Sequence, residues 1–168
     1  TKEASDLILQ DDNFASIVAA VRQGRVIYDN IRKFIRYMLS SNLGEVLTMF
    51  AVVLFRLPLP LLPIHILLVN LFTDGLPAMA LSMDPANEDV MERKPRPKNE
   101  GIFAGGLGLH ILLRGIVIGA GTVGVFAHVW HSLGDLMLAR TAAFFTLACS
   151  QLVFVFECKS ERKGMFTK

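Results

Sequence analysis

Residues 16–55 follow a hydrophobic pattern that predicts one long helix. From about Ser16 to Phe55 apolar residues recur at helical spacing, and no proline occurs before Pro58. The part that ends at Tyr37 is amphipathic and basic, whereas the part from Met38 onward is almost uncharged and about the length of a membrane-crossing helix. We therefore expect a helix of roughly 40 residues whose second half lies in a bilayer.

Three more apolar runs follow the first one. After the span at residues 38–55, the pattern predicts spans at about 61–83, 107–130 and 141–156, with a polar loop at 84–104. Hydrophobic residues make up 52% of the chain, which is typical of a membrane protein. The sequence therefore predicts an all-α membrane protein with four transmembrane helices and a lipid bilayer, not nucleic acid, as its surroundings.

The basic residues predict the orientation of these spans. Fourteen of the 17 Lys and Arg residues lie before the first span, at residues 93–98, or in the C-terminal tail. Four spans place these segments on one side, which the positive-inside rule makes cytoplasmic. Arg114 lies near the cytoplasmic start of the third span, where its side chain could extend to the interface. We expect the charged run at residues 84–100 to be a solvated loop.

Polar residues recur inside two of the predicted spans. Asn42 and Glu45 are three residues apart on the first span, and Asn70, Thr73 and Asp74 share one helix face on the second. A charge at the centre of a membrane helix costs about 2.5 to 3.5 kcal/mol on insertion scales, so two carboxylates there need a reason. Counted from the cytoplasmic ends of their spans, both carboxylates lie at a depth of about 12 to 14 Å, so they can meet.

The chemistry of these side chains favours a hard cation. Carboxylate, amide and hydroxyl oxygens suit calcium, and we expect Gly75 and Pro77 to break the second span and free backbone carbonyls for the same site. No His or Cys lies at this depth, which argues against zinc or copper. The alternative is that these groups only form hydrogen bonds between helices. The two cysteines indicate neither a disulfide framework nor a metal cluster.

Four glycines in the third span predict close helix packing. Gly115 and Gly119 form a GxxxG pattern, and Gly121 and Gly124 follow it. Small residues at this spacing let two helix backbones approach each other. We therefore interpret them as a packing face, not as part of a binding site.

Two motifs carry a resemblance to a known family. The segments DDNFASIVAAVRQGRVIYDNIRKFIRYMLSSNLGEVL and VNLFTDGLPAMALSMDP closely resemble the C-terminal region of P-type calcium-transporting ATPases of the sarco/endoplasmic-reticulum type and their bacterial relatives. The resemblance covers nearly the whole chain. It implies that residues 1–15 end a phosphorylation domain, that 16–37 form a cytoplasmic stalk helix, and that 38–168 contain helices five to eight of a ten-helix transmembrane region.

The resemblance also implies a set of ion ligands. The matching ligands are Asn42, Glu45, Asn70, Thr73 and Asp74. Gln151 matches a further ligand on the family's eighth helix, where the sarcoplasmic pump has a Glu, so one calcium per cycle is as plausible as two. Glu157 lies too close to the cytoplasmic end of its span to replace that Glu.

The implied activity is ATP-driven export of Ca²⁺ from the cytoplasm with proton counter-transport. The family's phosphorylation, nucleotide-binding and actuator motifs and its fourth helix are not among these 168 residues. No catalytic residue is therefore expected here, and ATP and Mg²⁺ would bind in the N-terminal part of the same pump. A bacterial plasma membrane is the expected location, with both ends of the segment cytoplasmic.

Two other interpretations stay open at the sequence level. One is a non-catalytic four-helix bundle, either channel-like or structural, that uses the same polar residues to hold its helices together. The other is a pump of the same type that moves Mn²⁺ or another cation.

Overall fold

The computed structural model is all-helical and describes residues 13–85, 88–95, 97 and 101–159. Within these residues, four helical segments are long and apolar enough to cross a membrane: Phe14–Leu54, Pro63–Ser82, Leu107–Leu133 and Leu136–Lys159. An all-α fold with four candidate spans is thus confirmed. Most of the predicted domain end at residues 1–15, part of the loop at 84–104 and the tail beyond residue 159 lie outside the described residues.

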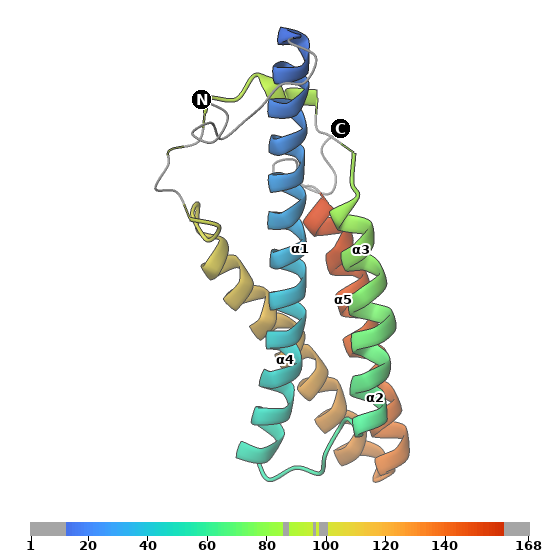
Figure 1. Ribbon diagram of the computed structural model, residues 1–168. Helices are drawn as coiled ribbons and strands as arrows, with labels where there is room; N and C mark the ends of the chain where they lie inside the picture. Colours follow the sequence, from blue (N-terminus) through green and yellow to red (C-terminus); the bar gives the residue numbers. More distant parts are fainter. Residues whose placement is uncertain (1–12, 86–87, 96, 98–100, 160–168) are drawn as a thin grey trace.

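The first helix, α1 (Phe14–Leu54), is a single helix of 41 residues, as its spacing predicts. Its N-cap is Asn13, whose side chain accepts a hydrogen bond from the Ala15 N–H. At 1.5 Å per residue the helix is roughly 60 Å long, about twice the thickness of the hydrocarbon core of a bilayer. Figure 1 shows the N-terminal part of α1 extending beyond the other helices.

The second span contains a π-helical turn. It consists of α2 (Pro63–Leu68), the π-helix η2 (Val69–Gly75) and α3 (Leu76–Ser82). The predicted break at Gly75 and Pro77 is wrong, because Gly75 has helical dihedrals (φ −65°, ψ −53°) and Pro77 lies in the first turn of α3. Proline has no N–H to give to the carbonyl four residues earlier. A wider π-turn lets the chain remain helical through this position.

The third and fourth spans are α4 (Leu107–Leu133) and α5 (Leu136–Lys159). Gly106 and Gly134, with φ of 81° and 67°, flank α4 in the left-handed conformation that glycine adopts most readily. The Asp135 carboxylate begins α5 by accepting hydrogen bonds from the Met137 and Leu138 N–H groups. Both helices extend past the expected spans of 107–130 and 141–156.

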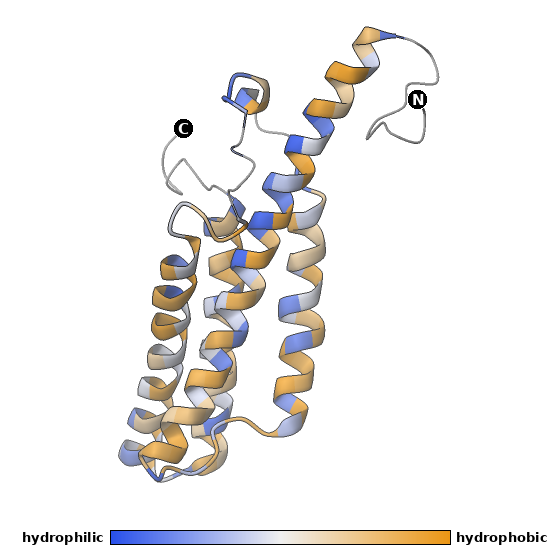
Figure 2. Cartoon of the chain, turned by 60° about the vertical axis from the view of Figure 1, so that its left-hand side comes forward, coloured by the Kyte–Doolittle hydropathy of each residue, from blue (hydrophilic) through white to orange (hydrophobic). Residues whose placement is uncertain are grey.

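The other three segments pack with α1 into a four-helix bundle. Figure 1 shows α4 crossing α1 and α5 lying beside α3. Many large apolar side chains on the outer helix faces are exposed, among them Phe50, Leu67, Val117 and Phe145. Figure 2 shows that hydrophobic residues dominate the helices, while hydrophilic ones gather near the end where α1 extends and the loop lies. This distribution is typical of a bundle surrounded by lipid.

The glycines of α4 contact α1 closely. A Cβ atom added at Gly115 would lie 2.7 Å from Leu43 Cγ, and one at Gly119 would lie 3.1 Å from the Gly44 carbonyl oxygen. These two positions confirm the predicted packing face. Gly121 and Gly124 have open space around them within the described residues, so the part of the prediction that included them is wrong.

The described part of the loop after α3 is held against α1. Arg25 on α1 donates hydrogen bonds to the Val90 and Arg93 carbonyls, both at 2.9 Å, and the Arg93 guanidinium pairs with Asp29 of α1 at 2.6 Å. The loop includes the short 3₁₀ helix η3 (Glu88–Met91). The expectation of a solvated loop agrees with the exposed Glu92 and Lys94 but is wrong for Val90 and Arg93, because α1 supplies specific partners for them.

Candidate ion-binding site

The candidate site lies between three helices of the bundle. Glu45 is on α1, Asp74 is on the π-helix η2, and Gln151 is on α5, and all three side chains are buried. The Gln151 Nε2 donates a hydrogen bond of 3.0 Å to the Glu45 carboxylate. Asp74 lies near enough to Glu45 for two negative charges there to repel each other. The structure thus brings together two carboxylates and the amide that was matched to the family's eighth helix.

Several oxygens of this site are buried without a good partner. Both carboxylate oxygens of Asp74, the Gln151 Oε1 and the Ser41 hydroxyl make no hydrogen bond of normal geometry within the described residues, although Ser41 lies beside Asp74. Buried polar atoms are nearly always hydrogen-bonded, because an unpaired one costs about 1 to 3 kcal/mol. Buried oxygens without donors are groups that a bound cation or its water would satisfy.

Thr73, Asn42 and Asn70 lie in different surroundings. Thr73 is buried next to Asp74 in the sequence, and Asn42 is half-buried, with its side-chain nitrogen donating to the Met38 carbonyl of its own helix at 2.9 Å. Asn70 is exposed, unlike Glu45 and Asp74, which are buried. The described helices leave the face of the second span that carries Asn70 uncovered. An amide side chain that faced lipid there without a hydrogen-bond partner would be unfavourable.

Two further residues of this region, Ser41 and Tyr37, are not indicated by the polar pattern of the spans. Ser41 precedes Asn42 directly, and its place beside Asp74 depends on how α1 and η2 pack. Tyr37 donates a hydrogen bond of 2.5 Å from its hydroxyl to the Thr73 carbonyl. That carbonyl is four residues before Pro77 and has lost its usual helical donor. Only the spacing of Pro77 and Thr73 hints at this bond in the sequence, since the tyrosine comes from another helix.

Glu157 takes no part in the site. It pairs with Arg36 of α1 at 3.2 Å and with Arg114 of α4, at the end of the bundle where α1 extends. Arg114 thus has an ion-pair partner and is not simply extended toward an interface. Phe154 lies under both guanidinium groups, with centroid distances of 5.8 and 6.0 Å. This agrees with the expectation that Glu157 is too near the end of its span to replace a ligand.

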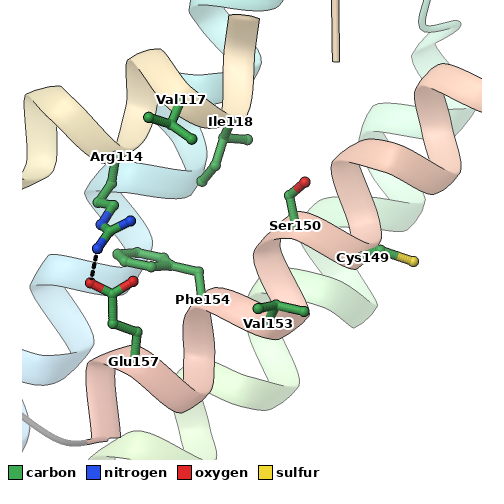
Figure 3. Close-up of a pocket in the computed structure, with 8 residues that line it drawn as sticks. All are labelled: Arg114, Val117, Ile118, Cys149, Ser150, Val153, Phe154 and Glu157. Carbon is green, nitrogen blue, oxygen red and sulfur yellow. Dashed lines mark hydrogen bonds and ion pairs between the residues drawn. The ribbon is translucent and has the colours of Figure 1, made fainter. Parts of the chain in front are cut away.

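A separate groove lies between α4 and α5. It has a volume of about 370 Å³ and a largely apolar lining with the Arg114–Glu157 pair at one side, as Figure 3 shows. Neither Glu45 nor Asp74 lines this groove. Among the described residues there is also no group of three or more His, Cys, Asp or Glu side chains placed to hold a metal ion. Any cation site here would therefore depend on neutral oxygens in addition to the two carboxylates.

Comparison with known proteins places the chain in a family. Residues 58–168 match the family described as "Cation transporting ATPase, C-terminus". The chain belongs to this family of cation-transporting ATPases. The matched region contains the second, third and fourth candidate membrane spans.

Individual relatives extend the match toward the N-terminus. The chain is 56% identical to a calcium-transporting ATPase of Bacillus subtilis over 161 residues, which is 95% of this chain and 18% of that protein. It is 43% identical to calcium-transporting ATPase 1 of Bacillus cereus, covering 99% of this chain and 20% of the relative. An endoplasmic-reticulum-type calcium-transporting ATPase of Arabidopsis thaliana is 44% identical over 136 residues, 81% of this chain and 13% of that protein. The chain thus spans about a fifth or less of the length of these relatives.

Proposed function

We propose that this chain is the transmembrane ion-binding part of an ATP-driven calcium pump that exports Ca²⁺ from the cytoplasm. The observation that carries the proposal is the buried pair Glu45 and Asp74, brought together by separate helices beside oxygens without donors. Two carboxylates and several neutral oxygens match the hard ligands that calcium prefers. The names of the relatives point to the same ion.

In this proposal the four spans are helices five to eight of ten, and residues 16–37 form a cytoplasmic stalk. Both ends of the segment face the cytoplasm of a bacterium, and a phosphorylation domain ends at residues 1–15. The ligands are Asn42, Glu45, Asn70, Thr73, Asp74 and Gln151. The exposed side chain of Asn70 supports a further helix on that face, because a fourth helix opposite would cover it and complete the coordination.

Proton counter-transport follows from the burial of the two carboxylates. When calcium leaves, two uncompensated charges would remain in a low-dielectric region, which is strongly unfavourable. Protons that bind as calcium is released would remove these charges. The transported protons would then use the same side chains as the transported ion.

ATP and Mg²⁺ act outside this segment in the proposal. Phosphorylation of an upstream domain would move the stalk part of α1, and α1 carries Asn42 and Glu45 directly into the site. The chemistry of phosphoryl transfer would belong to that domain, while this segment binds, holds and releases the ion.

The test is ATP-driven uptake of radioactive calcium into inside-out vesicles that contain the full-length protein. The proposal expects Ca²⁺ uptake to require ATP and to be inhibited only weakly by Mn²⁺. Because protons leave the vesicles as Ca²⁺ enters, ATP should acidify the medium less when Ca²⁺ is omitted. Preferential Mn²⁺ uptake would reassign the ion. Calcium flux that needs no ATP would instead support a channel-like bundle and contradict the proposal.

A further inference from the structure

A row of polar residues on one face of α1 faces the second span. Asn30, Lys33 and Tyr37 are spaced i, i+3 and i+7, so they lie along the same side of the helix. All three are buried, and Lys33 is only 1% exposed. Burial of a lysine to this degree is rare unless its charge is paired.

These residues contact the end of α3 that lies toward the loop. The Asn30 side-chain nitrogen donates to the Ser82 carbonyl at 3.2 Å and to the Asp84 carbonyl at 2.8 Å. The Lys33 ammonium lies 2.6 Å from an Asp84 carboxylate oxygen. The last carbonyls of a helix lack donors of their own, and a cation there is also favoured by the helix dipole. The C-terminus of α3 is therefore capped by α1.

The π-helix η2, which leads into α3, is held by the same face of α1. Tyr37 donates to the Thr73 carbonyl, the acceptor that Pro77 leaves without a donor. Asp74 directly follows Thr73, so α3 lies between two attachments to α1, and one of them adjoins a carboxylate of the candidate site. With one attachment at its C-terminal end and another in the η2 turn before it, α3 cannot slide along α1 without breaking buried polar contacts.

We infer that Asn30, Lys33 and Asp84 form a clamp that makes α3 move together with α1, so that displacement of the stalk repositions Asp74 as well as Glu45. The inference rests on the proposed function, since it concerns how phosphorylation reaches the ion site. It assigns positioning roles to residues outside the ligand set. Without the clamp, the stalk would move Glu45 while Asp74 stayed behind.

The test compares charge variants in the full-length protein, reading Ca²⁺ uptake and ATP hydrolysis in the same vesicles. K33D and D84K should each lower the Ca²⁺ transported per ATP hydrolysed at least threefold, while Ca²⁺-stimulated hydrolysis continues. The exchanged pair K33D/D84K should recover the wild-type ratio within about twofold. Lys159 is the matched control: its ammonium lies 3.7 Å from the same carboxylate but is 63% exposed, so K159Q should leave the ratio unchanged.

Other results would overturn the clamp. A wild-type ratio in both single variants contradicts it, and so does an equal loss of hydrolysis and transport that the exchanged pair does not reverse, since that indicates a purely structural role. If the Lys33 variants do not insert, N30A removes the cap without changing charge and is read in the same way. Absence of ATP-driven uptake in the wild-type protein would contradict the proposed function instead, so the two failures are distinguishable.

Discussion

Single residues define the candidate site through what they lack. The Asp74 carboxylate is 1% exposed, and neither of its oxygens has a good donor within the described residues. Glu45 has a donor in Gln151, whose own carbonyl oxygen is unpaired. A structure that only fastened helices together would be expected to pair these groups fully. The unpaired oxygens therefore favour an ion site over a set of structural hydrogen bonds.

Gln151 offers a residue-scale prediction. In Q151L the Glu45 carboxylate loses its donor, and hydrogen bonds to charged groups contribute about 1.5 to 3 kcal/mol. We expect the apparent Ca²⁺ affinity for activation of ATP hydrolysis by the full-length protein to fall about tenfold or more. S150A is the matched control, because the Ser150 hydroxyl donates only to the Thr146 carbonyl of its own helix. An unchanged Ca²⁺ affinity in Q151L would remove Gln151 from the site.

Tyr37 offers a second prediction at this scale. Y37F removes the donor to the Thr73 carbonyl and leaves that buried oxygen unpaired, at a cost of about 1 to 3 kcal/mol. We expect a lower midpoint of thermal unfolding in detergent and weaker Ca²⁺ binding. T122V is the comparison: the Thr122 hydroxyl bonds to the Ile118 carbonyl of its own helix, which keeps its helical donor. Equal stability losses in the two variants would show that the Tyr37 bond has no special role.

At the scale of elements, the second span departs most from what its sequence indicates. Gly75 and Pro77 predict an interruption, yet the chain passes them as a π-turn followed by α3. The local sequence shows that Pro77 has no N–H to donate. It does not show that the Tyr37 hydroxyl, 36 residues before Thr73, donates to the Thr73 carbonyl instead. The long α1 was predictable because its apolar spacing is continuous and no proline interrupts it.

Helix contact between α1 and α4 gives an element-scale prediction. In G115A the new methyl would lie under 3.0 Å from three side-chain atoms of Leu43, so the helices must separate or repack. Overpacking of this kind costs about 1 to 3 kcal/mol. G121A places the same group in open space on the same helix. Thermal unfolding in detergent should show a clear loss for G115A and little change for G121A, whereas equal losses would contradict the packing of α4 on α1.

At the scale of the whole molecule, hydropathy and charge along the sequence predict the membrane spans but not the contacts between distant side chains. Four candidate spans follow from length and composition, whereas the hydrogen bond from Gln151 to Glu45 joins residues 106 positions apart. The attachment of the loop to α1 was not predictable, because residues such as Arg93 and Asp29 are 64 positions apart and read as ordinary solvated charges. Asn70 stays exposed on a face of the second span that the described helices do not cover, where the proposed function expects a further helix.

The most direct measurement is Ca²⁺-dependent phosphorylation by ATP of the full-length protein carrying D74N. The substitution keeps the size of the side chain and removes its charge, so the ion site should fail while membrane insertion is retained. D135N is the matched control, since Asp135 caps α5 away from the site and asparagine can accept the same hydrogen bonds. We predict that D74N abolishes Ca²⁺-dependent phosphorylation and D135N does not. Normal calcium dependence in D74N would contradict the assignment of this site.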